Sequence, residues 1–287
     1  MALGALLISL LLSTLASTST EQALQTAQSH FAAGRYAEAV TMLTTALDAA
    51  PQDAPINYWL ARSYYEQRNY ERAITYGEAA VKLAPENGEY ERWLGRIYGA
   101  KAEQSRSFFL ARRVKQAFEA AVRLAPRSIE ARRDLMQYLA EAPWIVGGDK
   151  GKAKEEVQAI AQLDPMEGHL AQAAYLSAQK KWKDAQTEYL AVLDMHPSRI
   201  EPYMEAAEFF ADRKDPTNLE RVLVEASHLN SNSHDPRLDF YRAVVLILRG
   251  TERSTAQKLL TSYINNIPER SNYPSHDSAR QWLRTGN

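Results

Sequence analysis

The sequence reads WLARSY at residues 59–64 and WLGRIY at residues 93–98, so the same pattern returns after 34 residues. Prolines that close successive segments keep a similar spacing: Pro51, Pro85, Pro126, Pro165 and Pro197. They are 34, 41, 39 and 32 residues apart. A recurring period of this size predicts stacked copies of one supersecondary unit rather than a single closed core.

Each period predicts two amphipathic helices joined by a turn. In the first unit, apolar and small residues at spacings of three and four mark both helices: Ala23, Ala27, Phe31, then Ala39, Leu43 and Ala46. Gly34 marks the turn between them, and Pro51 ends the second helix because proline cannot continue it.

Small and aromatic residues recur at matching places in successive units. The second and third units show them most fully: Leu60, Ala61, Tyr64, Tyr70, Ala73, Ala80, Pro85, and Leu94, Gly95, Tyr98, Phe118, Ala121, Pro126. Over about residues 20–268 this pattern resembles the tetratricopeptide repeat family. The resemblance implies an all-α fold, a TPR-type α-solenoid in which antiparallel helix pairs stack into a right-handed superhelix.

We expect one array over residues 18–287, with about seven helix pairs and a C-terminal capping helix near Pro274–Leu283. Two units carry insertions, at residues 101–113 and 142–149, which we expect to form loops. In the sixth unit Leu219 stands where other units have a small residue at the start of the second helix.

The N-terminus predicts export. Residues 2–15 are almost wholly apolar and are followed by small residues, although no Lys or Arg precedes them. This pattern is typical of a signal peptide, residues 1–17, with cleavage after Ala16 or Ser17 and a periplasmic or secreted protein. The alternatives are an uncleaved N-terminal membrane anchor and a buried helix of the array. Otherwise we expect no stable membrane span.

Composition limits the classes of function. The net charge of −1 gives no global electrostatic argument for binding nucleic acid, and the absence of cysteine removes thiol chemistry and cysteine-ligated metals. The six histidines are scattered and no catalytic motif occurs. We therefore predict no enzyme activity, no catalytic residue, no cofactor and no metal.

By the same resemblance, the first helices of the units line a concave groove that binds partners. In units two to four the expected groove residues are Tyr58, Arg62, Tyr65, Arg92, Arg96, Arg133 and Gln137. The four arginines form a positive stripe, suited to carboxylates, unless local acids such as Glu66, Glu91 and Asp134 neutralise them. Trp144 and Ile145, in the second insertion, are expected either to contact a partner or to fold back over the stack.

These observations predict a non-enzymatic scaffold or adaptor that binds a protein or peptide in the groove. The alternative is a receptor or transport accessory for a small anionic ligand, which requires a deep pocket near the insertions. We also expect that the array is able to form a homodimer.

Overall fold

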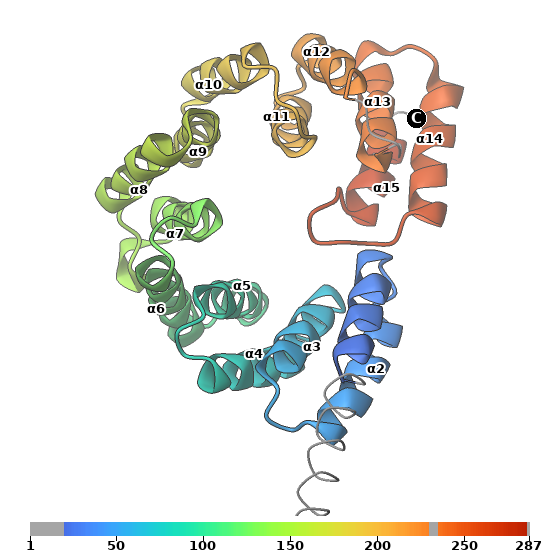
Figure 1. Ribbon diagram of the computed structural model, residues 1–287. Coiled ribbons are helices and arrows are strands. Elements are labelled where there is room, and N and C mark those ends of the chain that lie inside the picture. The colour runs from blue at the N-terminus through green and yellow to red at the C-terminus, as the bar shows by residue number, and fades with distance from the viewer. Residues whose placement is uncertain (1–19, 230–234, 286–287) are drawn as a thin grey trace, which may run out of the picture. The chain divides into compact units, whose positions relative to one another are not determined.

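The computed structural model describes residues 20–229 and 235–285, and this part of the chain is built of helices and connecting turns without β-strands (Figure 1). The predicted signal peptide, residues 1–17, lies outside the described residues. No helix in the described ranges is long and apolar enough to cross a membrane. The all-α solenoid of stacked helix pairs that we predicted is confirmed.

Two compact units make up the chain, and the boundary between Ala159 and Ile160 falls within helix α8. Unit one contains a helix over residues 20–32 followed by α2 (Tyr36–Ala49), α3 (Ala54–Glu66), α4 (Tyr70–Leu83), α5 (Gly88–Ser105), α6 (Phe108–Leu124), α7 (Ile129–Glu141), the 3₁₀-helix η1 (Trp144–Val146) and the start of α8 (Lys150–Leu163). The expectation of one continuous array over residues 18–287 stays a prediction.

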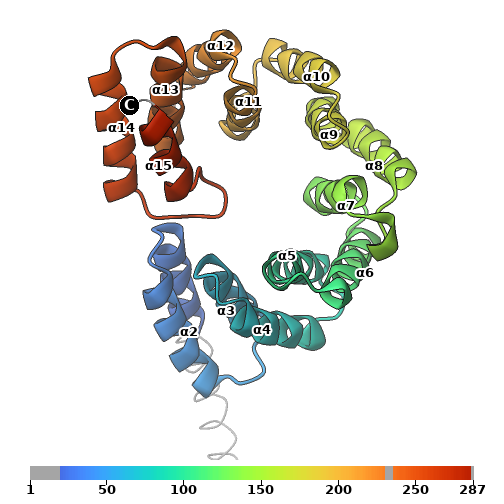
Figure 2. The same ribbon diagram turned by 180° about the vertical axis from the view of Figure 1, so that it is seen from behind.

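Unit two begins within α8 and continues with three helix pairs and a final helix (Figure 2). Its helices are α9 (Pro165–Ala178), α10 (Trp182–Asp194), α11 (Glu201–Asp212), α12 (Pro216–Ser227), α13 (Pro236–Arg249), α14 (Arg253–Asn266) and α15 (His276–Thr285). Helix α15 packs against α13 and α14, the position expected of a terminal cap.

Side-chain caps explain where many helices begin. A free helix N-terminus leaves amide groups without partners, and short polar side chains supply them. In unit one, the side chains of Asp53, Asn69, Asn87, Ser107 and Ser128 accept hydrogen bonds from the first turns of α3, α4, α5, α6 and α7. The helix boundaries are therefore fixed locally by sequence.

The fourth residue of the second helix is a recurring core position. It is at most 1% exposed in six of the pairs: Ala39, Ala73, Ala153, Ala185, Leu219 and Ala256. A small residue lets two helix backbones approach closely. Leu219 departs from the small-residue pattern but is fully buried, so the helices of the sixth pair accommodate a larger side chain at this position.

The prediction that residues 101–113 form a loop is wrong. Helices α5 and α6 contain 18 and 17 residues, whereas the other helices of the pairs from α2 to α14 contain 12 to 14. The extra residues lengthen both helices, and the turn between them is short because Arg106 adopts a left-handed conformation with φ 52°.

The second insertion is an ordered turn. Val146 in η1 is buried, and Gly147 follows with φ +102°, a conformation that favours glycine. The Asp149 carboxylate then accepts hydrogen bonds from the amides of Gly151 and Lys152. This segment connects α7 to α8 through specific backbone contacts.

Candidate partner-binding face

Helices α3, α5 and α7 lie side by side on one face of unit one, with α4 and α6 behind them (Figure 1). Each pair places its first helix on this face, so residues one unit apart in sequence become neighbours in space. We call this surface the α3–α5–α7 face. It carries the residues that the repeat register predicted for the groove.

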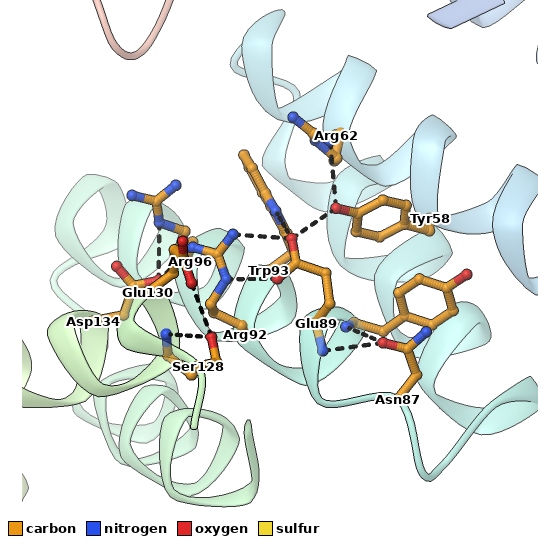
Figure 3. A network of polar contacts seen from close by, with 12 residues as sticks. Tyr58, Arg62, Asn87, Glu89, Arg92, Trp93, Arg96, Ser128, Glu130 and Asp134 are labelled. Atoms are coloured by element: carbon orange, nitrogen blue, oxygen red, sulfur yellow. Dashed lines mark hydrogen bonds and ion pairs between the residues drawn. The ribbon is translucent and has the colours of Figure 1, made fainter. Parts of the chain in front are cut away.

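Glu89, at the start of α5, joins two neighbouring helices (Figure 3). Its Oε1 accepts hydrogen bonds from the Tyr58 hydroxyl at 3.0 Å, the Trp93 indole Nε1 at 2.9 Å and Arg92 Nη2 at 2.9 Å. Its Oε2 accepts a further hydrogen bond from Arg92 Nε at 2.8 Å, so the arginine binds it through both oxygens. Bidentate pairing of this kind fixes the geometry of both side chains.

Asp134 of α7 connects the network to a third helix. Its Oδ2 lies 3.1 Å from Arg92 Nη1 and 3.2 Å from Arg96 Nε. The side chain of Arg92 is 11% exposed, whereas that of Arg96 is 42% exposed. Arg92 thus pairs with both Glu89 and Asp134 and is largely covered, while Arg96 pairs with Asp134 and remains more accessible to solvent.

Arg62 has a different environment. Its guanidinium carbon lies 4.3, 4.4 and 4.8 Å from the ring centroids of Trp59, Trp93 and Phe31, an arrangement that we call the aromatic cage. Its Nη1 donates to the Tyr58 hydroxyl at 3.3 Å, and its Nε is buried without a hydrogen-bond partner among the described residues. Cation–π attraction holds the group in place but does not neutralise its charge.

The three arginines of the network differ in their ion pairs. Arg92 pairs with Glu89 and Asp134, and Arg96 pairs with Asp134, whereas Arg62 forms no ion pair with a carboxylate in the described part of the chain (Figure 3). Burial raises the pKa of Tyr58, with Arg62 opposing and Glu89 reinforcing that effect, so its hydroxyl stays neutral. Arg62 is therefore the member of this group without a counter-ion, and Arg96 is the one most accessible to solvent.

Contacts within the network also shift the pKa values of Glu89 and Arg92. Partial burial alone would raise the pKa of Glu89, but hydrogen bonds from Arg92, Tyr58 and Trp93, with the charge of Arg92, lower it overall. Burial alone would lower the pKa of Arg92, but the carboxylates of Glu89 and Asp134 raise it overall. Both groups are charged throughout the physiological range.

The other predicted residues lie around this network. Tyr65 is half-buried, and its ring packs edge-on against Trp93 at 5.7 Å. Arg133 is half-buried on α7 next to Asp134 in sequence, and the exposed Gln137 donates to Glu141 of its own helix. Trp144 and Ile145 are exposed in η1, outside the α3–α5–α7 face.

Sequence reasoning missed two parts of the arrangement. Glu89 corresponds to Pro55 in the preceding unit, so the 34-residue register gives no signal for it. Phe31 belongs to the first pair and was assigned only to the core. Its packing against Trp59 and Arg62 could be inferred only from the stacking of that pair on α3.

Similarity to known proteins agrees with the fold. Residues 24–88 match the family model described as tetratricopeptide repeat. This segment is therefore similar to tetratricopeptide repeats. The resemblance inferred from the sequence is thus confirmed, and no curated protein matches the chain.

Three solved structures show how far the fold extends. A tetratricopeptide repeat protein from Parabacteroides merdae aligns with a TM-score of 0.58 at 10% identity, over 94% of this chain and 99% of that one. A thermophilic tetratricopeptide protein from Thermus thermophilus aligns at 0.52 and 23% identity, over 61% and 90%. PilF of Pseudomonas aeruginosa aligns at 0.51 and 15% identity, over 76% and 95%. At these identities the likeness concerns the fold.

Two of the cavities among the described residues lie in unit two. One of about 1060 Å³ is lined by residues of α12 and α13, including Arg242 and Val245, and one of about 410 Å³ lies between α11, α13 and α15. Neither is lined by the insertions at 101–113 and 142–149, where the small-ligand alternative expected its pocket. The described ranges contain no group of three or more His, Asp or Glu side chains placed to hold a metal.

Proposed function

We propose that this chain is an exported, non-enzymatic scaffold whose α3–α5–α7 face binds an acidic segment of a partner protein or peptide. Stacked helix pairs form extended binding surfaces, and such folds serve generally in protein–protein interaction. Export to the periplasm or beyond is part of the proposal and rests on the apolar N-terminal run.

One observation carries the choice of an acidic partner. Arg62 is held between aromatic rings, its Nε has no partner among the described residues, and no carboxylate contacts it there. Arg62 is half-buried, and a buried donor without a partner is costly, so a carboxylate that arrives from a partner would supply both a counter-ion and an acceptor. The aromatic cage also limits the rotamers of Arg62, so little entropy is lost on binding.

Arg96 supplies the second contact. Its side chain is 42% exposed, and Asp134 is the carboxylate that pairs with it in the described part of the chain. The Trp93 ring lies 5.2 Å from the guanidinium of Arg96 and 4.4 Å from that of Arg62. The two cations therefore flank one indole, a spacing suited to two acidic side chains of one extended segment.

Selection from an unbiased peptide display library tests this proposal. We expect enriched peptides to carry paired Asp or Glu residues. Arg62→Gln should weaken their binding about 10- to 100-fold, since a hydrogen bond to a charged group contributes about 1.5–3 kcal/mol. Arg96→Gln should weaken it about tenfold.

Asp134→Asn gives a test of opposite sign. The substitution removes a carboxylate that competes for Arg96, while Arg92 keeps Glu89 as its partner. Acidic peptides should bind this variant more tightly than wild type. Arg280→Gln, in the exposed part of α15, is the matched control and should change nothing. Peptides without acidic residues, or affinities insensitive to Arg62 and Arg96, would refute the proposed recognition, and selective stabilisation by a small anionic metabolite would favour the alternative.

A further inference from the structure

The lengthened α5–α6 pair ends in an exposed apolar surface. Phe108 and Phe109, the first two residues of α6, are 67% and 71% exposed, and Trp144 and Ile145 of η1 are 84% and 52% exposed. We call these four side chains the α6 tip. They lie on different elements from the α3–α5–α7 face.

Tyr138 brings the two parts of the tip together. Its hydroxyl lies 2.6 Å from the carbonyl oxygen of Ala111 in α6 and 2.8 Å from that of Val146 in η1. Val146 is 5% exposed and anchors η1 against the stack. Trp144 and Ile145 are consequently held outward beside the first turn of α6.

Local folding does not account for the aromatic residues at this place. Ser107 caps α6 by accepting a hydrogen bond from the Leu110 amide at 3.3 Å, so the helix start is complete without Phe108 or Phe109. Large apolar side chains gathered on a surface typically mark an interaction site.

The surroundings of the tip are basic. Residues 101–115 contain five cations, Lys101, Arg106, Arg112, Arg113 and Lys115, and one acid, Glu103, in a chain whose net charge is −1. Lys101, Arg113 and Lys115 pair with Glu71, Glu78 and Glu119. Arg106 and Arg112 are exposed, and in the described part of the chain no carboxylate lies within ion-pair distance of either.

We propose that the α6 tip docks on the surface of an anionic lipid bilayer. Aromatic rings partition into the headgroup region, and nearby arginines interact with lipid phosphates. The exposed start of α6, with Arg106 and Arg112 on either side, complements an extended anionic surface. Such contact does not require a pocket on the surface that it binds. This site would hold the scaffold at a membrane while the α3–α5–α7 face remains available for a protein.

Vesicle sedimentation tests the proposal with the full chain. The probes are vesicles of phosphatidylcholine alone and of phosphatidylcholine with phosphatidylglycerol in a 3:1 ratio. Wild type should bind the anionic vesicles at least tenfold more tightly than the neutral vesicles. Arg106→Gln with Arg112→Gln should lose about tenfold or more on anionic vesicles only, since each cation near such a surface contributes about fivefold.

Substitution of the apolar side chains completes the test. Phe108→Ser with Phe109→Ser, and separately Trp144→Ser with Ile145→Ser, should each weaken vesicle binding at least tenfold while helicity stays unchanged. A control with Val224→Ser and Arg280→Gln, exposed in unit two, should bind like wild type. The comparison within one chain removes any contribution of the apolar N-terminal run.

Three results would overturn the proposal. The first is equal binding of wild type to neutral and anionic vesicles, and the second is equal binding of anionic vesicles by the tip variants and wild type. The third is self-association in the absence of lipid that the tip substitutions abolish, because it would identify a second copy of the chain as the occupant. Quenching of Trp144 fluorescence by brominated lipid, measured against a Trp144→Phe variant, should be seen only with anionic vesicles.

Discussion

Gly95 and Gly99 of α5 provide a matched test of how closely the helices pack. A Cβ atom at Gly95 would lie 2.5 and 2.6 Å from two ring carbons of Phe118 in α6. Phe118 is 6% exposed, so its ring has little room to move. A Cβ atom at Gly99, about one turn further along, would lie 4.0 Å from Val114 Cγ2, which is ordinary contact.

Both substitutions by alanine gain about 1 kcal/mol of helix propensity. Gly95→Ala also overpacks the α5–α6 contact, which costs about 1–3 kcal/mol. Because the propensity gain is common to both, the difference in unfolding free energy between the two variants measures the packing cost. We expect Gly99→Ala to be more stable than wild type and to exceed Gly95→Ala by about 2 kcal/mol.

Urea unfolding followed by far-ultraviolet circular dichroism gives this difference. Helix pairs in a repeat array can unfold separately, so hydrogen exchange of the α5 and α6 amides should accompany it. Exchange should accelerate in these two helices for Gly95→Ala and slow for Gly99→Ala. Equal stability of the two variants would refute the close approach of α5 and α6 and the reason given for a small residue at position 95.

Two further predictions concern core shape and acid stability. Leu219→Ala would introduce the small residue found in other pairs, but Leu219 is fully buried, so the variant should lose about 2–5 kcal/mol of unfolding free energy in urea. The control Val224→Ala, at a side chain that is 54% exposed, should change stability by less than about 0.5 kcal/mol. An unaffected Leu219→Ala variant would contradict the described core. Glu89 has a lowered pKa in the folded chain, so its contribution is present above its unfolded pKa of about 4.3 and is lost as pH falls through the lower folded value. The Glu89 side chain is 44% exposed, so the stability difference between wild type and Glu89→Gln should be at most about 1 kcal/mol. This difference should be constant near pH 7 and shrink below about pH 4.5. A difference that grows on acidification would contradict the network.

Much of the fold could be predicted because its signals are local and periodic. The buried alanines Ala39, Ala73 and Ala185 recur at one place in the second helices, and prolines separate the pairs. The lengths of α5 and α6 could not be predicted in the same way. Extra residues appear in sequence as a break in the period, and that break does not distinguish a loop from longer helices.

The candidate site shows a similar division. The 34-residue repeat predicted that Arg62 and Arg96 occupy equivalent positions, but it could not show that their surroundings differ. Phe31 from the preceding pair closes the aromatic cage around Arg62, whereas Asp134 from the following pair approaches Arg96. Contacts across a solenoid depend on neighbours one unit before and one unit after, and these residues do not repeat.

The most direct test of the account is photo-crosslinking in the native cell envelope. A photoreactive residue at Tyr65, which packs on Trp93 of the α3–α5–α7 face, is compared with one at the exposed Lys82 on α4. We predict that the Tyr65 position crosslinks to an acidic segment of another protein, that Lys82 does not, and that Arg62→Gln with Arg96→Gln abolishes the product. Crosslinks of equal yield from both positions, or a Tyr65 product unaffected by the arginine substitutions, would contradict recognition at this face.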